Sequence, residues 1–212
     1  MDAVGHLIMQ ASYSSYASPL ALSLALRQFH SGEMITLKID TNSDYSFVPF
    51  NLHANHWTLF VISHKKSRIY FYDPLSADVP TDPEVVQAAL VLKQVLKSST
   101  QKIYKAFVAD NVPLQQDLIN CGVYVIMLMV SVALNHSFCT RADNANLHRL
   151  YIAHWIMRGS IRLGKIRLED DQIEKVLEEQ EEDLFGDREV AQIQSIPRAK
   201  PFVPSTPQMP SV

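Results

Sequence analysis

Three residues that lie far apart in the sequence could perform chemistry together: a cysteine, a histidine and an aspartate. Cys121 stands where the polar stretch VPLQQDLIN ends and the apolar stretch GVYVIMLMV begins, a change that indicates the N-terminus of a helix. A helix N-terminus and a nearby imidazole both favour the nucleophilic thiolate form of a cysteine. Taken alone, however, a cysteine at such a junction is more often a small buried core residue.

The histidine and the aspartate lie at the ends of two consecutive predicted strands. His56 begins HWTLFVIS (56–63) and Asp73 closes RIYFYD (68–73), with the polar turn HKKS between them. A hairpin centred on that turn places the His56 end of one strand beside the Asp73 end of the other. A histidine can then act as general base while a carboxylate orients its ring. The simpler readings are a surface histidine and an Asp-Pro turn.

A thiolate that attacks a carbonyl also needs hydrogen-bond donors for the developing oxyanion. The side-chain amide of Gln115, six residues before Cys121, and the Cys121 backbone N–H are the candidates, with Gln116 as the alternative to Gln115. Taken together, these residues predict a cysteine hydrolase in which Cys121 is the nucleophile and His56 the base.

Composition restricts the class of protein further. The chain has 212 residues, 47% of them hydrophobic, and a formal net charge of −3. These values predict one domain with a sizeable core and no general affinity for nucleic acid or anionic membranes. Only two cysteines occur, Cys121 and Cys139, which argues against a secreted disulfide framework and for a reducing compartment, the nucleus or cytoplasm.

The sequence predicts neither a membrane anchor nor a metal site. The N-terminus lacks the features of a signal peptide, and the longest apolar run, 123–134, is shorter than the roughly 20 residues that a bilayer requires. The two cysteines are not at metal-ligand spacing, and the pair His53 and His56 shows no further ligands. We therefore expect no metal or organic cofactor.

The elements that must position the three residues form a mixture of helices and strands. Strands are predicted at 34–39, 45–52, 56–63, 68–73 and 102–109, and helices at 19–29, 81–97, from 121 onward and at 144–161. Pro49 places the second strand at an edge or a strand end. After the folded domain, 1–165, the sequence predicts an acidic helix (166–185) and a disordered Pro-rich tail (186–212).

In their order and spacing these motifs resemble those of the Ulp-type (sentrin-specific) cysteine proteases. FVPFN ahead of the histidine, HWTLFVI itself, the 17-residue step from His56 to Asp73 and QQDLINCG each match that family, over roughly residues 45–134. The resemblance implies an α+β fold with a papain-like core of the Ulp and adenovirus-protease type, a central mixed or antiparallel sheet flanked by helices. It also implies a catalytic set of His56, Asp73, Cys121 and Gln115, with Trp57 covering the substrate tail.

The resemblance implies a reaction and a partner as well. The expected activity is that of a cysteine-type peptidase cleaving after the Gly-Gly tail of SUMO or a related, for example NEDD8-like, ubiquitin-like modifier. No cofactor, nucleic acid or membrane partner is expected. The sequence determines neither which modifier is preferred nor the oligomeric state.

Two departures from the family pattern leave alternatives open. The Trp-Leu-Asn-Asp segment of many members is absent from the 55 residues before His56, which raises doubt about the substrate tunnel and is consistent with a fragment of a longer protein. Asn120 replaces the usual Asp before the cysteine. A member that only binds a ubiquitin-like protein, and a His–acid–Cys acetyltransferase of the effector type, are the alternative functions.

Overall fold

A mixed five-stranded sheet forms the centre of the molecule. The computed structural model describes residues 1–109, 112–134 and 145–161. Within these ranges the strands lie in the order β1-β2-β3-β4-β5, and they are β1 (Ser14–Tyr16), β2 (Tyr45–Leu52), β3 (His56–Ser63), β4 (Arg68–Tyr72) and β5 (Lys105–Val108). β1 with β2 and β4 with β5 pair in parallel, whereas β2, β3 and β4 form an antiparallel meander.

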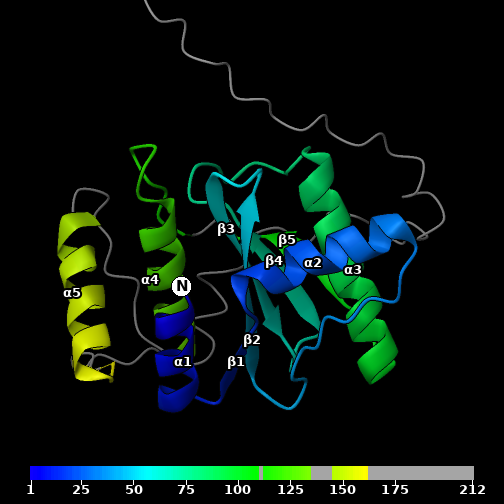
Figure 1. Ribbon diagram of the computed structural model, residues 1–212, viewed down its shortest axis with the longest axis horizontal. Helices are drawn as coiled ribbons and strands as arrows, with labels where there is room; N and C mark the ends of the chain where they lie inside the picture. Colours follow the sequence, from blue (N-terminus) through cyan, green and yellow to red (C-terminus); the bar gives the residue numbers. More distant parts are fainter. Residues whose placement is uncertain (110–111, 135–144, 162–212) are drawn as a thin grey trace, which may run out of the picture.

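Helices cover both faces of this sheet (Figure 1). The five helices of the described residues are α1 (Asp2–Ala11), α2 (Pro19–Ser31), α3 (Pro83–Thr100), α4 (Cys121–Ala133) and α5 (Ala145–Arg158). α4 contacts β3, α1 and α5, while α2 contacts β2 and α3. The α+β class with a mixed sheet between helices, which the sequence predicts, is confirmed.

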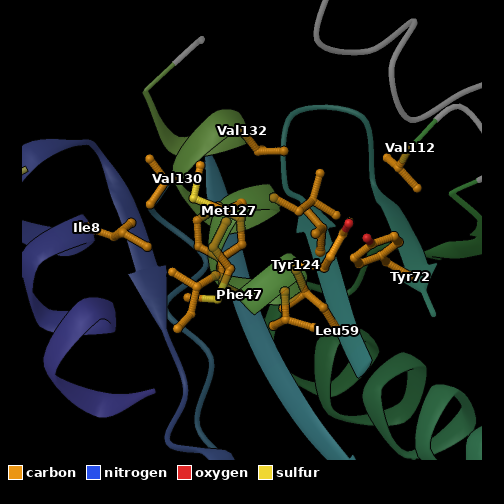
Figure 2. Packing of buried hydrophobic residues seen from close by; sticks show 14 of the residues in the cluster. Ile8, Phe47, Leu59, Tyr72, Val112, Tyr124, Met127, Val130 and Val132 are labelled. Carbon is orange, nitrogen blue, oxygen red and sulfur yellow. The ribbon is translucent and has the colours of Figure 1, made fainter. Parts of the chain in front are cut away.

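Each strand of the meander supplies both cores because successive side chains point to opposite faces of a sheet. Phe47 and Leu59 belong to the cluster that contains α1 and α4, whereas their neighbours Val48 and Phe60 belong to the cluster that contains α2 and α3. Figure 2 shows Phe47 and Leu59 close to Tyr124 of α4. Strands buried on both faces lack polar alternation, which explains the almost uninterrupted apolar runs in the sequence.

α4 is the most deeply buried helix that positions the site. Eleven of its residues are buried, every one except Gly122 and Ala133. A helix that is hydrophobic on all sides requires partners all round it, and here the sheet lies on one side and α1 and α5 on others. None of the helices in the described ranges is both long and apolar enough to cross a membrane.

Most predicted elements are present, with shifts of a few residues at their ends. β2 and β3 have the predicted bounds, and α2 and α3 each run two or three residues beyond the predicted end. Pro49 fits its position because β1 pairs only with Tyr45–Phe47, which leaves the other side of β2 without a strand at Pro49.

The strand predicted at 34–39 is wrong. Within the part of the chain that the structure describes, this segment pairs with no strand, although Leu37 is buried in the cluster with α2 and α3. Its backbone is held instead by side chains, since the N–H of Thr36 donates to Oε1 of Gln28. An extended segment that packs one face on a core shows the same alternation as a paired strand, so the pattern alone could not separate the two.

α1 and β1 were not predicted from the sequence, and the predicted segments at 166–185 and 186–212 lie outside the described residues. α1 packs closely on β1: a Cβ added to Gly5 would lie 2.6 Å from the ring carbons of Tyr16. The glycine is therefore required for the approach of helix to strand, a tertiary contact that helix propensity does not reveal.

Candidate active site

The hairpin of β3 and β4 brings His56 and Asp73 together. Its register pairs Leu59 with Tyr72, so the residue after β4 lies near the start of β3. The Nε2 of His56 is 2.7 Å from Oδ1 of Asp73, and the two side chains are 16% and 21% exposed. An ionised carboxylate only accepts hydrogen bonds, so Nε2 carries the proton and Nδ1 is the basic nitrogen. The backbone N–H of Leu75 also donates to Oδ1 of Asp73, at 2.8 Å.

Cys121 lies at the same end of the sheet. It is the first residue of α4 and is 7% exposed. Its Sγ accepts a hydrogen bond from the backbone N–H of Trp57 at 3.5 Å, so the sulfur lies beside the residue that follows His56. The thiol therefore lies at the N-terminus of α4, beside the start of β3.

Trp57 lies against the start of α4. A Cβ placed on Gly122 would lie 3.4 Å from Cδ1 of Trp57, which is ordinary contact. The indole is partly buried and packs on the cluster that contains α4. Trp57 is therefore held next to the residue that follows the thiol, and its role toward a substrate tail stays a prediction.

Gln115 lies in the loop before α4, and this loop is fastened to the end of β4. The Gln115 backbone N–H donates to the carbonyl of Pro74 at 2.8 Å, and the hydroxyl of Tyr72 donates to the carbonyl of Pro113 at 2.9 Å. Burial raises the pKa of Tyr72, which keeps this hydroxyl protonated as a donor. These hydrogen bonds thus connect the loop to β4, the strand that Asp73 follows.

The Gln115 side chain is itself buried, with 7% of the residue exposed. Its Nε2 donates to the carbonyl of Asp117 at 2.5 Å, while its Oε1 is buried and has no hydrogen-bond partner among the described residues. One of the two Nε2 hydrogens is used in this bond, which leaves the second as a candidate oxyanion donor. That role, for Gln115 or for the neighbouring Gln116, stays a prediction.

A second group of polar residues, which was not predicted from the sequence, surrounds the position before the cysteine. The Asn120 side chain lies between the carboxylate of Asp117 and the guanidinium of Arg149 on α5. The hydrogen bond from the Asn120 side chain, followed by that from the Ile119 backbone, holds the pKa of Asp117 below its usual value. The spacing Asp-x-x-Asn is a sequence signal for such a turn, but nothing in the sequence indicates Arg149.

His53 has partners that the sequence analysis did not anticipate. Its Nε2 is 2.7 Å from Asp82 and its Nδ1 is 3.0 Å from Glu84, at the N-terminus of α3. The sequence-based statement that no further ligands accompany His53 is therefore wrong, since donor atoms of all three residues lie within 4.8 Å of one another. Each ring nitrogen already lies within hydrogen-bond distance of its own carboxylate, so contacts within the cluster account for its geometry.

Comparison with known proteins places this chain in a family. The sequence model of the Ulp1 protease family, C-terminal catalytic domain, matches residues 30–154, more than half of the chain. This chain belongs to the Ulp1 protease family. Ubiquitin-like-specific protease 1 of Saccharomyces cerevisiae is 28% identical over 124 residues, which are 56% of this chain and 19% of the yeast protein. The chain thus covers about a fifth of that relative's length.

Solved structures of Ulp1-type domains share the fold of this Ulp1-family chain. The C-terminal Ulp1 protease domain in complex with Smt3, the yeast ortholog of SUMO, has a TM-score of 0.64 at 20% identity, with 76% of each chain covered. The Ulp1-like SUMO protease catalytic domain of Chaetomium thermophilum has a TM-score of 0.59 at 17% identity, covering 83% of this chain and 73% of that one. Members of the Ulp1 family are cysteine proteases that act on ubiquitin-like proteins.

Proposed function

We propose that this chain is a cysteine protease that cleaves after the C-terminal Gly-Gly of SUMO or a related ubiquitin-like modifier, with Cys121, His56 and Asp73 as catalytic residues. The observation that carries the proposal is the 2.7 Å contact between His56 and Asp73, together with the Cys121 sulfur on the backbone N–H of Trp57. Family membership supports the same reaction, and it supports SUMO as the modifier to test first.

In the proposed mechanism, Asp73 holds Nε2–H of His56, so that Nδ1 takes the proton of the Cys121 thiol. The thiolate attacks the carbonyl carbon of the terminal glycine, and a C–S bond forms. His56 then returns the proton to the leaving amine as the C–N bond breaks. Water, deprotonated by His56, hydrolyses the thioester and releases the modifier with a free carboxylate.

Two further groups complete the proposed mechanism. The Cys121 N–H and the Gln115 amide donate to the oxyanion of each tetrahedral intermediate, and the loss of one such donor typically costs about 100- to 1,000-fold in kcat. Trp57 covers the tail where it reaches Cys121. A glycine pair fits best there, because residues without side chains need the least space beside the indole, which lies at the start of α4.

The proposal is tested with a SUMO C-terminal fluorogenic amide and a SUMO vinyl-sulfone probe. The parent should release the fluorophore and become labelled at Cys121. Cys121→Ala and His56→Ala should lower kcat by at least about 1,000-fold while they keep the far-UV circular dichroism of the parent. Cys139→Ser is the matched control, because it removes the second thiol of the chain without altering Cys121.

Equal cleavage by the parent and Cys121→Ala would refute the proposal. Tight binding of SUMO without labelling or turnover would indicate a binding protein instead of a protease. Formation of a thioester from acetyl-CoA in the absence of any modifier would indicate an acetyltransferase. Ubiquitin and a NEDD8-like modifier, carrying the same fluorophore, determine which modifier is preferred.

A further inference from the structure

The residue before the proposed nucleophile is held by two side chains from different parts of the chain. Asn120 is 7% exposed, and its Nδ2 donates to Oδ2 of Asp117 at 2.6 Å. Its Oδ1 accepts from Nε of Arg149 at 2.9 Å and from Nη2 of Arg149 at 2.7 Å. Both ends of the buried Asn120 amide therefore have hydrogen-bond partners: a carboxylate accepts from the nitrogen, and a guanidinium donates to the oxygen.

Asp117 also fixes the backbone of the turn that leads into α4. Its Oδ1 accepts from the backbone N–H groups of Ile119 and Asn120, each at 2.9 Å. Its carbonyl accepts from Nε2 of Gln115. Arg149 adds a longer contact, 3.4 Å, from Nη2 to the carbonyl of Ile119. The same few groups thus connect the Gln115 side chain, the turn and α5.

We propose that Asp117 and Arg149 are positioning residues that fix the Asn120–Cys121 peptide unit through the Asn120 side chain. This inference rests on the proposed function, in which the Cys121 N–H and thiol must both face the reacting carbonyl. The peptide unit between residues 120 and 121 carries that N–H. Rotation of the backbone at Asn120 would therefore change the direction of the Cys121 N–H and the position of the Cys121 thiol at the same time.

The arrangement gives a physical reason for Asn120 in this chain. A buried side chain that faces an acid on one side and an arginine on the other needs a donor and an acceptor, and an amide supplies both. An aspartate at this position would place a second carboxylate at the 2.6 Å contact with Asp117. Two carboxylates at that distance cannot both stay ionised. The residue type at position 120 therefore depends on the residue type at position 117.

Exchanging the two residue types tests this coupling. In Asn120→Asp two carboxylates meet. In Asp117→Asn two amide nitrogens meet, unless the introduced amide turns and gives up the backbone N–H groups of Ile119 and Asn120. The double variant Asp117→Asn/Asn120→Asp restores every contact with the donor and the acceptor exchanged between the two positions. Its introduced carboxylate still accepts from Arg149, and the oxygen of its introduced amide still accepts from the turn.

Each single variant should lose about 10- to 100-fold in kcat with KM nearly unchanged, the cost expected of a small misplacement of reacting groups. The double variant should return to within about threefold of the parent, because coupled sites are non-additive. Arg149→Ala should behave as the single variants do. Arg158→Ala, which removes another arginine of α5, is the matched control and should keep parental kinetics.

A second readout is independent of any modifier. In a Cys139→Ser background the rate of alkylation of Cys121 by iodoacetamide is measured against pH. Both single variants should shift the profile and the double variant should restore it. Thermal midpoints and far-UV circular dichroism are recorded in parallel, and both readouts are compared at a temperature at which every variant is fully folded, so that a loss of fold alone does not change kcat or the alkylation profile.

Two results would overturn the inference: a double variant no more active or reactive than the worse single variant, or an Arg149→Ala protein that matches Arg158→Ala in kinetics and in alkylation. Failure of the proposed function is distinguishable from both. A parent that does not cleave any ubiquitin-like amide fails as a protease, whereas the alkylation profiles still decide whether Asp117 and Arg149 position the thiol.

Discussion

Replacement of Asp73 by asparagine should reduce activity without abolishing it, and the hydrogen bonds of Asp73 explain why. Its Oδ1 accepts from two donors, Nε2 of His56 at 2.7 Å and the N–H of Leu75 at 2.8 Å. An asparagine has one carbonyl oxygen to serve both donors. The Leu75 N–H is a fixed donor, so it holds that oxygen in place and prevents the amide nitrogen from facing His56. The productive tautomer of His56 therefore survives the substitution.

The substitution then removes only the negative charge of the acceptor, and the predicted loss of activity comes from that change alone. Hydrogen bonds to an ionised acceptor contribute about 1.5–3 kcal/mol and neutral ones about 0.5–1.5 kcal/mol. The difference, about 1–1.5 kcal/mol at the transition state, corresponds to about a 5- to 13-fold fall in kcat. Asp73→Ala removes the acceptor as well, leaves the ring of His56 free to turn, and should cost at least about 100-fold.

The assay is hydrolysis of the SUMO fluorogenic amide, with kcat and KM determined for both variants and for Asp78→Asn. Asp78 lies on the same loop, is exposed and contacts Ser76, so its variant should match the parent. If Asp73→Asn were as inactive as Asp73→Ala, the reasoning from the Leu75 contact would be wrong, because the amide would then have turned or the charge would supply most of the effect.

Two further predictions concern stability. Gly5→Ala should lower the free energy of unfolding by about 1–3 kcal/mol in urea denaturation, although alanine is the better helix former, because its Cβ would lie 2.6 Å from the Tyr16 ring; combination with Tyr16→Leu should recover most of the loss, and simple additivity would contradict this account. Burial lowers the pKa of His64, whose ring nitrogens lie 2.7 Å from the Ser46 hydroxyl and 3.1 Å from that of Tyr104. The unfolded chain then binds this proton more readily, so the stabilisation is complete above about pH 6.5 and is lost as the pH falls toward the lower folded pKa. Burial lowers the pKa of His148 in the same way. The urea midpoint of the parent should therefore decrease as the pH is lowered from about 7.5 to 5.5. If the dependence of the midpoint on pH were unchanged in both His64→Gln and His148→Gln, the assignment would be contradicted.

The central part of the fold could be predicted because its signals are local. The β3–β4 hairpin follows from two β-rich runs around a polar turn, and Asp82 and Pro83 mark the start of α3 in the sequence, where Asp82 accepts from the N–H of Glu84. The segment 34–39 shows the limit of such signals. Its alternation reports one buried face, which a lone extended segment and a paired strand have in common.

In the candidate site, too, the contacts that follow from local sequence could be predicted and those that depend on packing could not. The approach of His56 and Asp73 follows from hairpin register, and a helix start at Cys121 follows from the change in composition. The positions of Arg149 beside Asn120, and of Asp82 and Glu84 beside His53, depend on how separate elements pack, and sequence spacing does not encode them.

The distances along the chain between the three proposed catalytic residues have a consequence for how activity arises. The acid and the base are 17 residues apart on one hairpin, whereas the sulfur meets its backbone donor across 64 residues. Short loops close at lower entropic cost than long ones. A nascent chain can therefore assemble the acid–base pair early, but it obtains a reactive sulfur beside that pair only after the central helix has docked. Under the proposed function, proteolytic competence would thus be a late property of the chain, gained with the completed core.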